Sequence, residues 1–203
     1  MKRKERLGQC RGFTIVELVA VIAIIGVLAV LLIPTMLNAV EDSQISSANH
    51  LAKTIRDRSA EFFTKMDTQM NTHVGSEQTV QLIVQNGSWS IIGGAASDWI
   101  DGKNHWTTIQ NVSDPGNDSR QSTELLSFLA VAVQGIGTAY IEMHVETSYV
   151  IGVTVIEGST QSASSMPTTQ DLRDRTFGFD GSGKAGKLSD GTIIGSSPVL
   201  ELV

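Results

Sequence analysis

The sequence predicts an α+β fold in which a long N-terminal α-helix packs on a small antiparallel β-sheet. Three observations lead to this prediction. An apolar run fills residues 13–33, and apolar side chains then recur mostly every three or four residues as far as Met70, which is helical spacing. After the helix, short segments alternate apolar with polar residues, which is the spacing of strands.

The apolar run has the length of a membrane span. It holds 21 residues, Phe13–Ile33, with Glu17 as its one charged residue, and a bilayer core requires about 20 apolar helical residues. The first twelve residues hold five Lys or Arg against one Glu, a charge of +4, so the remainder carries −10 of the chain's total of −6. The basic leader favours membrane insertion with the leader inside, and the acidic remainder predicts no nucleic-acid binding.

Glu17 is the unusual residue of this run. A charged acid at the centre of a membrane costs about 2.5–3.5 kcal/mol, and less near the end of a span. One interpretation is that Glu17 reaches the membrane surface, and the other is that it meets a cation. Because no Lys or Arg lies between Gly12 and Lys53, a second molecule is the natural source of that cation.

The residues around Glu17 carry a family resemblance. A basic leader ends at Gly12, and Phe13, Glu17 and an apolar helix with Pro34 follow it. This arrangement resembles the N-terminus of a type IV pilin or of a related pseudopilin. The resemblance implies that a prepilin peptidase cleaves after Gly12 and methylates the new N-terminus at Phe13. It also implies that Glu17 then meets the N-terminal amine of a neighbouring subunit, and that the fold is pilin-like.

The organisation expected from these features has four parts. They are a leader peptide at residues 1–12, a transmembrane or filament-core helix at 13–34, the amphipathic half of the helix at 35–72, and a globular C-terminal domain at 73–203. We predict one helix from about Phe13 to Met70; the alternative is a membrane anchor and a separate helix, broken at Pro34. Gly26 and Pro34 both disfavour helix, so we predict helix flexibility at these two positions.

The apolar stripe of the second half of this helix is expected to pack on the globular domain. Its members are Ile45, Ala48, Ala52, Ile55, Phe62, Met66 and Met70, with Ser59 filling the gap. The domain is expected to hold strands at residues 79–84 and 88–92 across an NGS turn, a helix at 122–133, and a hairpin of 139–146 with 149–156. Residues 93–119 are expected to be loop with a short element at 106–112, and residues 158–170 an exposed loop. The glycine-rich tail from Thr176 has short apolar pieces.

Several other residues are candidate sites. Glu142, His144 and Glu146 share one face of a strand; a metal site is conceivable there, but a polar outer face is favoured. Asp180 and Asp190 are calcium candidates, although a plain turn is the favoured interpretation. Core packing is favoured for the three tryptophans, Trp89, Trp99 and Trp106. The single cysteine, Cys10, excludes an intramolecular disulfide, so the tail must be held by other means.

The function expected from the resemblance is structural rather than enzymatic, without a catalytic residue or cofactor. The chain would be a subunit that a prepilin peptidase cleaves and that assembles into a type IV pilus-like filament. Its partners would be the peptidase, other pilin subunits, the pilus or secretion machinery, and membrane lipid. It would span the inner or plasma membrane once before assembly, and lie afterwards in an extracellular pilus or an envelope pseudopilus. The alternatives are a type II secretion pseudopilin or minor pilin, and, from another class, a single-pass membrane-anchored extracellular binding protein.

Overall fold

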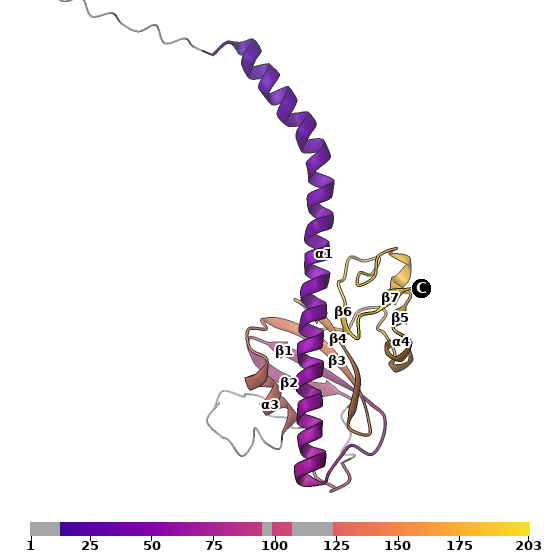
Figure 1. The fold of residues 1–203 in the computed structure, drawn as a ribbon. Coiled ribbons are helices and arrows are strands. Elements are labelled where there is room, and N and C mark those ends of the chain that lie inside the picture. The colour runs from indigo at the N-terminus through magenta and orange to yellow at the C-terminus, as the bar shows by residue number, and fades with distance from the viewer. Residues whose placement is uncertain (1–12, 95–98, 107–123) are drawn as a thin grey trace, which may run out of the picture. The chain divides into compact units, whose positions relative to one another are not determined.

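The structure, a computed structural model, describes residues 13–94, 99–106 and 124–203 (Figure 1). It confirms the α+β fold, with a long apolar helix followed by an antiparallel sheet. The chain divides into two compact units, with the boundary between Asp42 and Ser43. The elements of the described residues are α1 (Ile15–Met70), β1 (Gln78–Gln85), β2 (Ser88–Gly93), α3 (Leu125–Ala132), β3 (Thr138–Glu146), β4 (Tyr149–Glu157), α4 (Thr169–Asp174), β5 (Thr176–Phe177), η1 (Phe179–Gly181), β6 (Gly195–Ser197) and β7 (Glu201–Leu202).

Helix α1 is a single helix of 56 residues, so the one-helix prediction is confirmed and the alternative broken at Pro34 is wrong. Pro34 lies inside the helix, where the apolar pattern continues on both sides of it. The helix ends at Met70 because Asn71 adopts a left-handed conformation with φ 49°, which is a common way to stop a helix. The predicted end at Met70 is therefore confirmed.

The described residues form a five-stranded antiparallel sheet with the order β2-β1-β3-β4-β6. A two-residue turn, Asn86 and Gly87, joins β1 to β2, and both residues have positive φ, as such turns require. Thr147 and Ser148 join β3 to β4 in the same way. Both predicted hairpins are confirmed. Outside this sheet, β5 and β7 form a short parallel pair.

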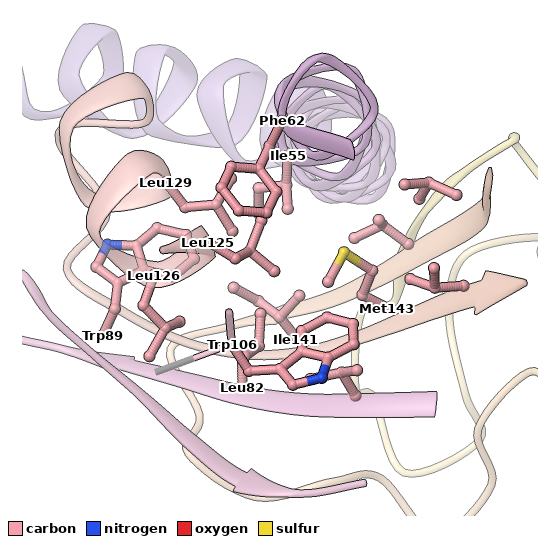
Figure 2. Close-up of a cluster of buried hydrophobic side chains, with 14 of the residues drawn as sticks. Ile55, Phe62, Leu82, Trp89, Trp106, Leu125, Leu126, Leu129, Ile141 and Met143 are labelled. Atoms are coloured by element: carbon pink, nitrogen blue, oxygen red, sulfur yellow. The ribbon is translucent and has the colours of Figure 1, made fainter. Parts of the chain in front are cut away.

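One face of the sheet packs against α1 and α3 (Figure 2). The buried side chains of α1 are Ala48, Ala52, Ile55, Ser59, Phe62, Phe63 and Met66, which is most of the predicted stripe. Phe63 joins it unexpectedly, whereas Met70 is 42% exposed. All three tryptophans are buried in this core, as predicted, and Trp99 stacks on Phe63 with ring centroids 5.8 Å apart.

The other face of the sheet is covered by the C-terminal part of the chain. Its apolar cluster consists of Tyr140, Ile151, Ile156, Leu172, Phe177, Phe179, Leu188, Ile194 and Leu200. Strands β3 and β4 are therefore buried on both faces, from Ala139 to Val145 and from Val150 to Ile156. This cover explains how the tail is held: β6 extends the sheet beside β4, and the remaining segments pack on its face.

Two helices differ from the expectation. Helix α3 begins at Leu125 rather than at Ser122, which lies outside the described residues, as do residues 107–112 of the expected short element. Helix α4 replaces the end of the loop expected at 158–170. Its start has a capping box, in which Thr168 and Asp171 exchange side chain-to-backbone hydrogen bonds. Six residues are too few for an apolar period to show in the sequence.

Strand β6 makes a close contact with α1 within the second unit. Gly195 lies directly against Ala48, so that a Cβ atom at Gly195 would be 2.6 Å from the Ala48 Cβ and closer still to its carbonyl group. Beside it, the backbone N–H of Ser196 donates to Oδ1 of Asn49 at 2.7 Å. The tail thus contacts the helix through the Ser196–Asn49 hydrogen bond and through close approaches of Gly195 to Ala48 and of Gly186 to Ile45.

Candidate functional site

The start of α1 is a closed set of hydrogen bonds between Thr14 and Glu17. The carboxylate oxygen Oε2 of Glu17 accepts from the backbone N–H of Thr14 at 3.0 Å and from its hydroxyl at 2.9 Å. In return, the Thr14 Oγ1 accepts from the backbone N–H of Glu17 at 3.2 Å. This reciprocal pair is a capping box, which satisfies amide groups that the first turn of a helix leaves without partners.

The capping box changes the interpretation of Glu17. The acid has no cation beside it in the described residues, as expected from the sequence, but it is not without a partner. Oε2 takes both bonds from Thr14, and Oε1 remains for another donor. Thr14 is a residue of this site that the sequence reasoning missed. Its signal was present as the spacing Thr-x-x-Glu immediately before an apolar run.

Phe13 lies at the exposed end of the described chain, next to this capping box. Its side chain is 82% exposed. Gly12, the residue before the predicted cleavage point, lies outside the described residues. A free amine at Phe13 would be one residue away from the Thr14 amide that Glu17 already binds. Cleavage between Gly12 and Phe13 and methylation of Phe13 stay predictions.

The apolar part of α1 presents its side chains to the surroundings. Large apolar residues from Ile15 to Val40 are between 45% and 81% exposed. Among the described residues, α1 is the one helix whose length and composition would let it cross a membrane, a test that a signal sequence also passes. A surface of this size requires cover by lipid or by protein. Glu17 sits at its beginning.

Gly26 and Pro34 lie within this apolar part. The helix continues through both positions, and a side chain at Gly26 would meet no atom within 4 Å. Gly26 is therefore not needed for a close contact within the chain. The predicted helix flexibility at the two residues stays a prediction.

A second polar cluster lies where the sequence predicted an outer strand face. Glu142 and His144 are only 6% and 3% exposed, because α4 and the segments after it cover that face. The prediction of a polar outer face is wrong for these two residues and holds for Glu146, which is exposed. The sequence could not show this cover, since the covering segment has little periodicity of its own.

The buried polar groups of this cluster bond to one another. Glu142 accepts hydrogen bonds from the Tyr140 hydroxyl at 2.6 Å and from the Gln81 amide at 3.1 Å. The Nδ1 of His144 lies 3.1 Å from the Thr79 hydroxyl and 3.0 Å from the Thr169 hydroxyl of α4. Burial, followed by the bond to Glu142, raises the pKa of Tyr140. Burial lowers the pKa of His144, against the opposing pull of nearby carboxylates.

A salt bridge fastens α4 at the edge of this cluster. Arg173 donates to Glu146 at 2.6 Å and to Glu77 at 3.2 Å. On the other side of α4, Leu172 fills the space left by Gly152, where a Cβ would approach its methyl groups to 2.9 Å. These contacts hold the C-terminal segment on the sheet. The polar cluster is therefore a packing feature rather than an open site.

The calcium candidates have local roles. Asp180 lies in η1 and accepts a long hydrogen bond of 3.5 Å from Ser164. Asp190 accepts from the backbone N–H of Thr192 at 2.8 Å, and this bond lowers the pKa of Asp190. Within the described part of the chain, no group of three or more His, Cys, Asp or Glu side chains is placed to hold a metal ion. The fold gives these two acids turn contacts.

Two family models match different parts of the chain. A family model described as "Domain of unknown function (DUF5021)" matches residues 45–201, and a model described as "Prokaryotic N-terminal methylation motif" matches residues 7–33. No curated protein and no solved structure matches the chain. The first range covers the sheet and the helices packed on it, and the second covers the end of the basic N-terminal segment, the capping box and the apolar part of α1.

Proposed function

Because the chain belongs to the family described as domain of unknown function DUF5021, and because it carries the prokaryotic N-terminal methylation motif of type IV prepilins, we propose that it is a filament subunit. A prepilin peptidase cleaves it between Gly12 and Phe13 and methylates Phe13. The mature subunits then assemble into a type IV pilus-like filament. The four parts proposed are the leader at 1–12, the core helix at 13–34, the amphipathic half at 35–72 and the outer domain at 73–203.

The observation that carries this proposal is the combination of Glu17 with an uncovered apolar helix. Before assembly, lipid of the inner membrane covers the helix. In the filament, neighbouring helices replace that lipid, and the surroundings of Glu17 remain apolar. Opposite charges attract more strongly in such surroundings than in water. The amine that cleavage creates at Phe13 of a neighbour is the matching cation, and Oε1 of Glu17 is open to it.

The experiment separates the charge of Glu17 from its capping role. Glu17→Gln keeps an oxygen that accepts from the Thr14 amide but removes the charge, whereas Glu17→Ala removes both. Both variants are expected to enter the membrane and to be processed. Both are expected to yield few filaments, because loss of one partner from a buried ion pair costs about 3–5 kcal/mol. Filaments are measured by electron microscopy after shearing, and processing by mass spectrometry of the N-terminus.

Thr14→Ala is the matched control. It removes the hydroxyl of the capping box and keeps the charge of Glu17, so we expect filament yield close to that of the unchanged protein. If Glu17→Gln assembles normally and Thr14→Ala does not, the acid serves as a helix cap and the proposed ion pair is wrong. An intact Met1 in the membrane-bound protein would favour an anchored binding protein instead of a filament subunit.

The position of the subunit in the filament is a separate question. Immunogold labelling with antibodies against the domain from residue 73 onward distinguishes the alternatives. Labelling along whole filaments identifies a major pilin, and labelling at the tips a minor one. Absence of surface filaments together with normal processing identifies a pseudopilin of the cell envelope.

A further inference from the structure

A groove of about 510 Å³ lies in the second unit, between α1, the loop that follows β4, and the turn before β6. We call it the α1–β4 groove. Helix α1 contributes Gln44 and Ser47, the end of β4 contributes Ile156 and Glu157, and the turn contributes Asp190 and Ile193. The volume falls within the range of about 300–1,000 Å³ that is usual for small-molecule sites. The groove takes no part in the proposed assembly contact at Glu17.

The lining of the groove combines hydrogen-bonding groups with apolar ones. Carboxylate and amide oxygens of Glu157, Asp190 and Gln44 accept hydrogen bonds, and the hydroxyls of its many serines both donate and accept. Ile156 and Ile193 add apolar surface. A sugar ring presents the same combination, because its hydroxyl groups lie around the rim of a ring whose faces carry C–H groups.

The charge of the groove restricts the ligand further. Two carboxylates line it, and its lining contains no Lys, Arg or His. An anionic ligand, such as a phosphorylated sugar or a uronic acid, would be repelled. The hydroxyl groups of a neutral saccharide would instead donate hydrogen bonds to the carboxylates. Carboxylates form stronger hydrogen bonds than neutral acceptors do.

The polar groups of the rim are available to a ligand. Among the described residues, the side chains of Gln44, Ser47 and Glu157 have no hydrogen-bond or ion-pair partner. Two other groups of the lining are held by hydrogen bonds. The Ser159 hydroxyl bonds to both backbone groups of Gln161, at 3.0 and 3.1 Å, and Asp190 is held by Thr192. A fixed site loses less entropy when a ligand binds.

We propose that the α1–β4 groove binds a short neutral saccharide. The ligand lies along Ile156 and Ile193, and Glu157 and Gln44 accept hydrogen bonds from its hydroxyls. Such a site gives the subunit a capacity to recognise glycans, which is independent of whether it builds a filament.

The experiment uses the full chain in a detergent without a sugar headgroup, with binding followed by ligand-observed NMR and calorimetry. The probes are glucose, galactose and N-acetylglucosamine, with glucosamine as a cationic probe and glucuronic acid as an anionic one. We expect millimolar binding of at least one neutral sugar and at least about tenfold weaker binding of glucuronic acid, a difference of about 1.4 kcal/mol.

Two variants locate the site. Gln44→Trp fills the groove from an exposed helix position, and Glu157→Ala removes an acceptor; each is expected to weaken sugar binding by about tenfold or more. Glu201→Ala, an exposed acid on β7 outside the groove lining, is the matched control and should bind as the unchanged protein does. Circular dichroism checks that each variant is folded.

Three results would overturn the proposal. The first is that no neutral sugar binds, including the result that glucosamine alone binds, which would indicate a site for amines. The second is that glucuronic acid binds as tightly as the neutral sugars. The third is that both Gln44→Trp and Glu157→Ala leave sugar binding unchanged, which would place any sugar site elsewhere.

Discussion

His144 shows how a single buried residue can make stability depend on pH. The imidazole lies under α4, and the ionisable groups of its surroundings are Glu142 and Tyr140 on its own strand and Glu77 just before β1. Burial, the dominant influence, lowers the pKa of His144 in the folded chain below about 6.5, the value for an unfolded chain. The unfolded chain therefore takes up a proton first as the pH falls.

We expect the free energy of unfolding to decrease as the pH falls below about 6.5, until the pH reaches the folded pKa. The limit for one proton is about 1.4 kcal/mol per pH unit. Denaturant unfolding of the full chain in detergent, between pH 7.5 and pH 5, measures this slope. His144→Gln should flatten it, and His50→Gln, at an exposed histidine of α1, should not. Equal slopes in all three proteins would contradict the assignment to His144.

The unusual position of Glu17 was apparent from sequence, whereas its hydrogen-bond partner Thr14 and the burial of His144 were not. Glu17 stands out because it is one acid in an apolar run, a contrast that sequence alone displays. His144 alternates with apolar neighbours, a pattern that predicts a solvent-exposed strand face. Only the folded chain shows that α4 and the tail cover it.

At the scale of elements, the packing of β6 on α1 depends on one missing side chain. Gly195→Ala would place a methyl group inside the contact radius of Ala48, and backbone atoms cannot move aside as a flexible side chain can. We expect this variant to lower the free energy of unfolding by about 1–3 kcal/mol, measured by denaturant unfolding. Gly178→Ala is the control, because its φ is −73° and a Cβ there would meet no atom within 4 Å. A loss in Gly178→Ala as large as that in Gly195→Ala would contradict this explanation.

The elements themselves were predictable to different degrees. Helix α1 and the two hairpins have strong periodicity or turn residues, such as Asn86-Gly87, and their bounds agree with the prediction to within about two residues. Helix α4 and strands β5, β6 and β7 are two to six residues long. Strand β6 depends on pairing with β4, β5 and β7 pair with each other, and α4 packs on β4. A local sequence pattern carries no signal for these long-range contacts.

At the scale of the whole molecule, the tail is held without a disulfide. The chain contains one cysteine, Cys10, which lies in the proposed leader. Other interactions hold the C-terminal segment on the sheet. They are the pairing of β6 with β4, the apolar cluster on that face and the Arg173 salt bridge. We expect the melting temperature of the processed chain to be the same with and without a reducing agent. A shift on reduction, observed by calorimetry at low protein concentration, would contradict this account.

The capping box of Thr14 and Glu17 has a consequence for the energetics of assembly. A carboxylate that already binds its own first turn does not gain its first partner when it joins a filament; it exchanges or shares one. The free energy that Glu17 would contribute to assembly is therefore the difference between two hydrogen-bonded states. This difference is smaller than the gain for a carboxylate that begins without a partner. In the proposed life of the subunit, Glu17 would therefore be hydrogen-bonded both in the membrane and in the filament.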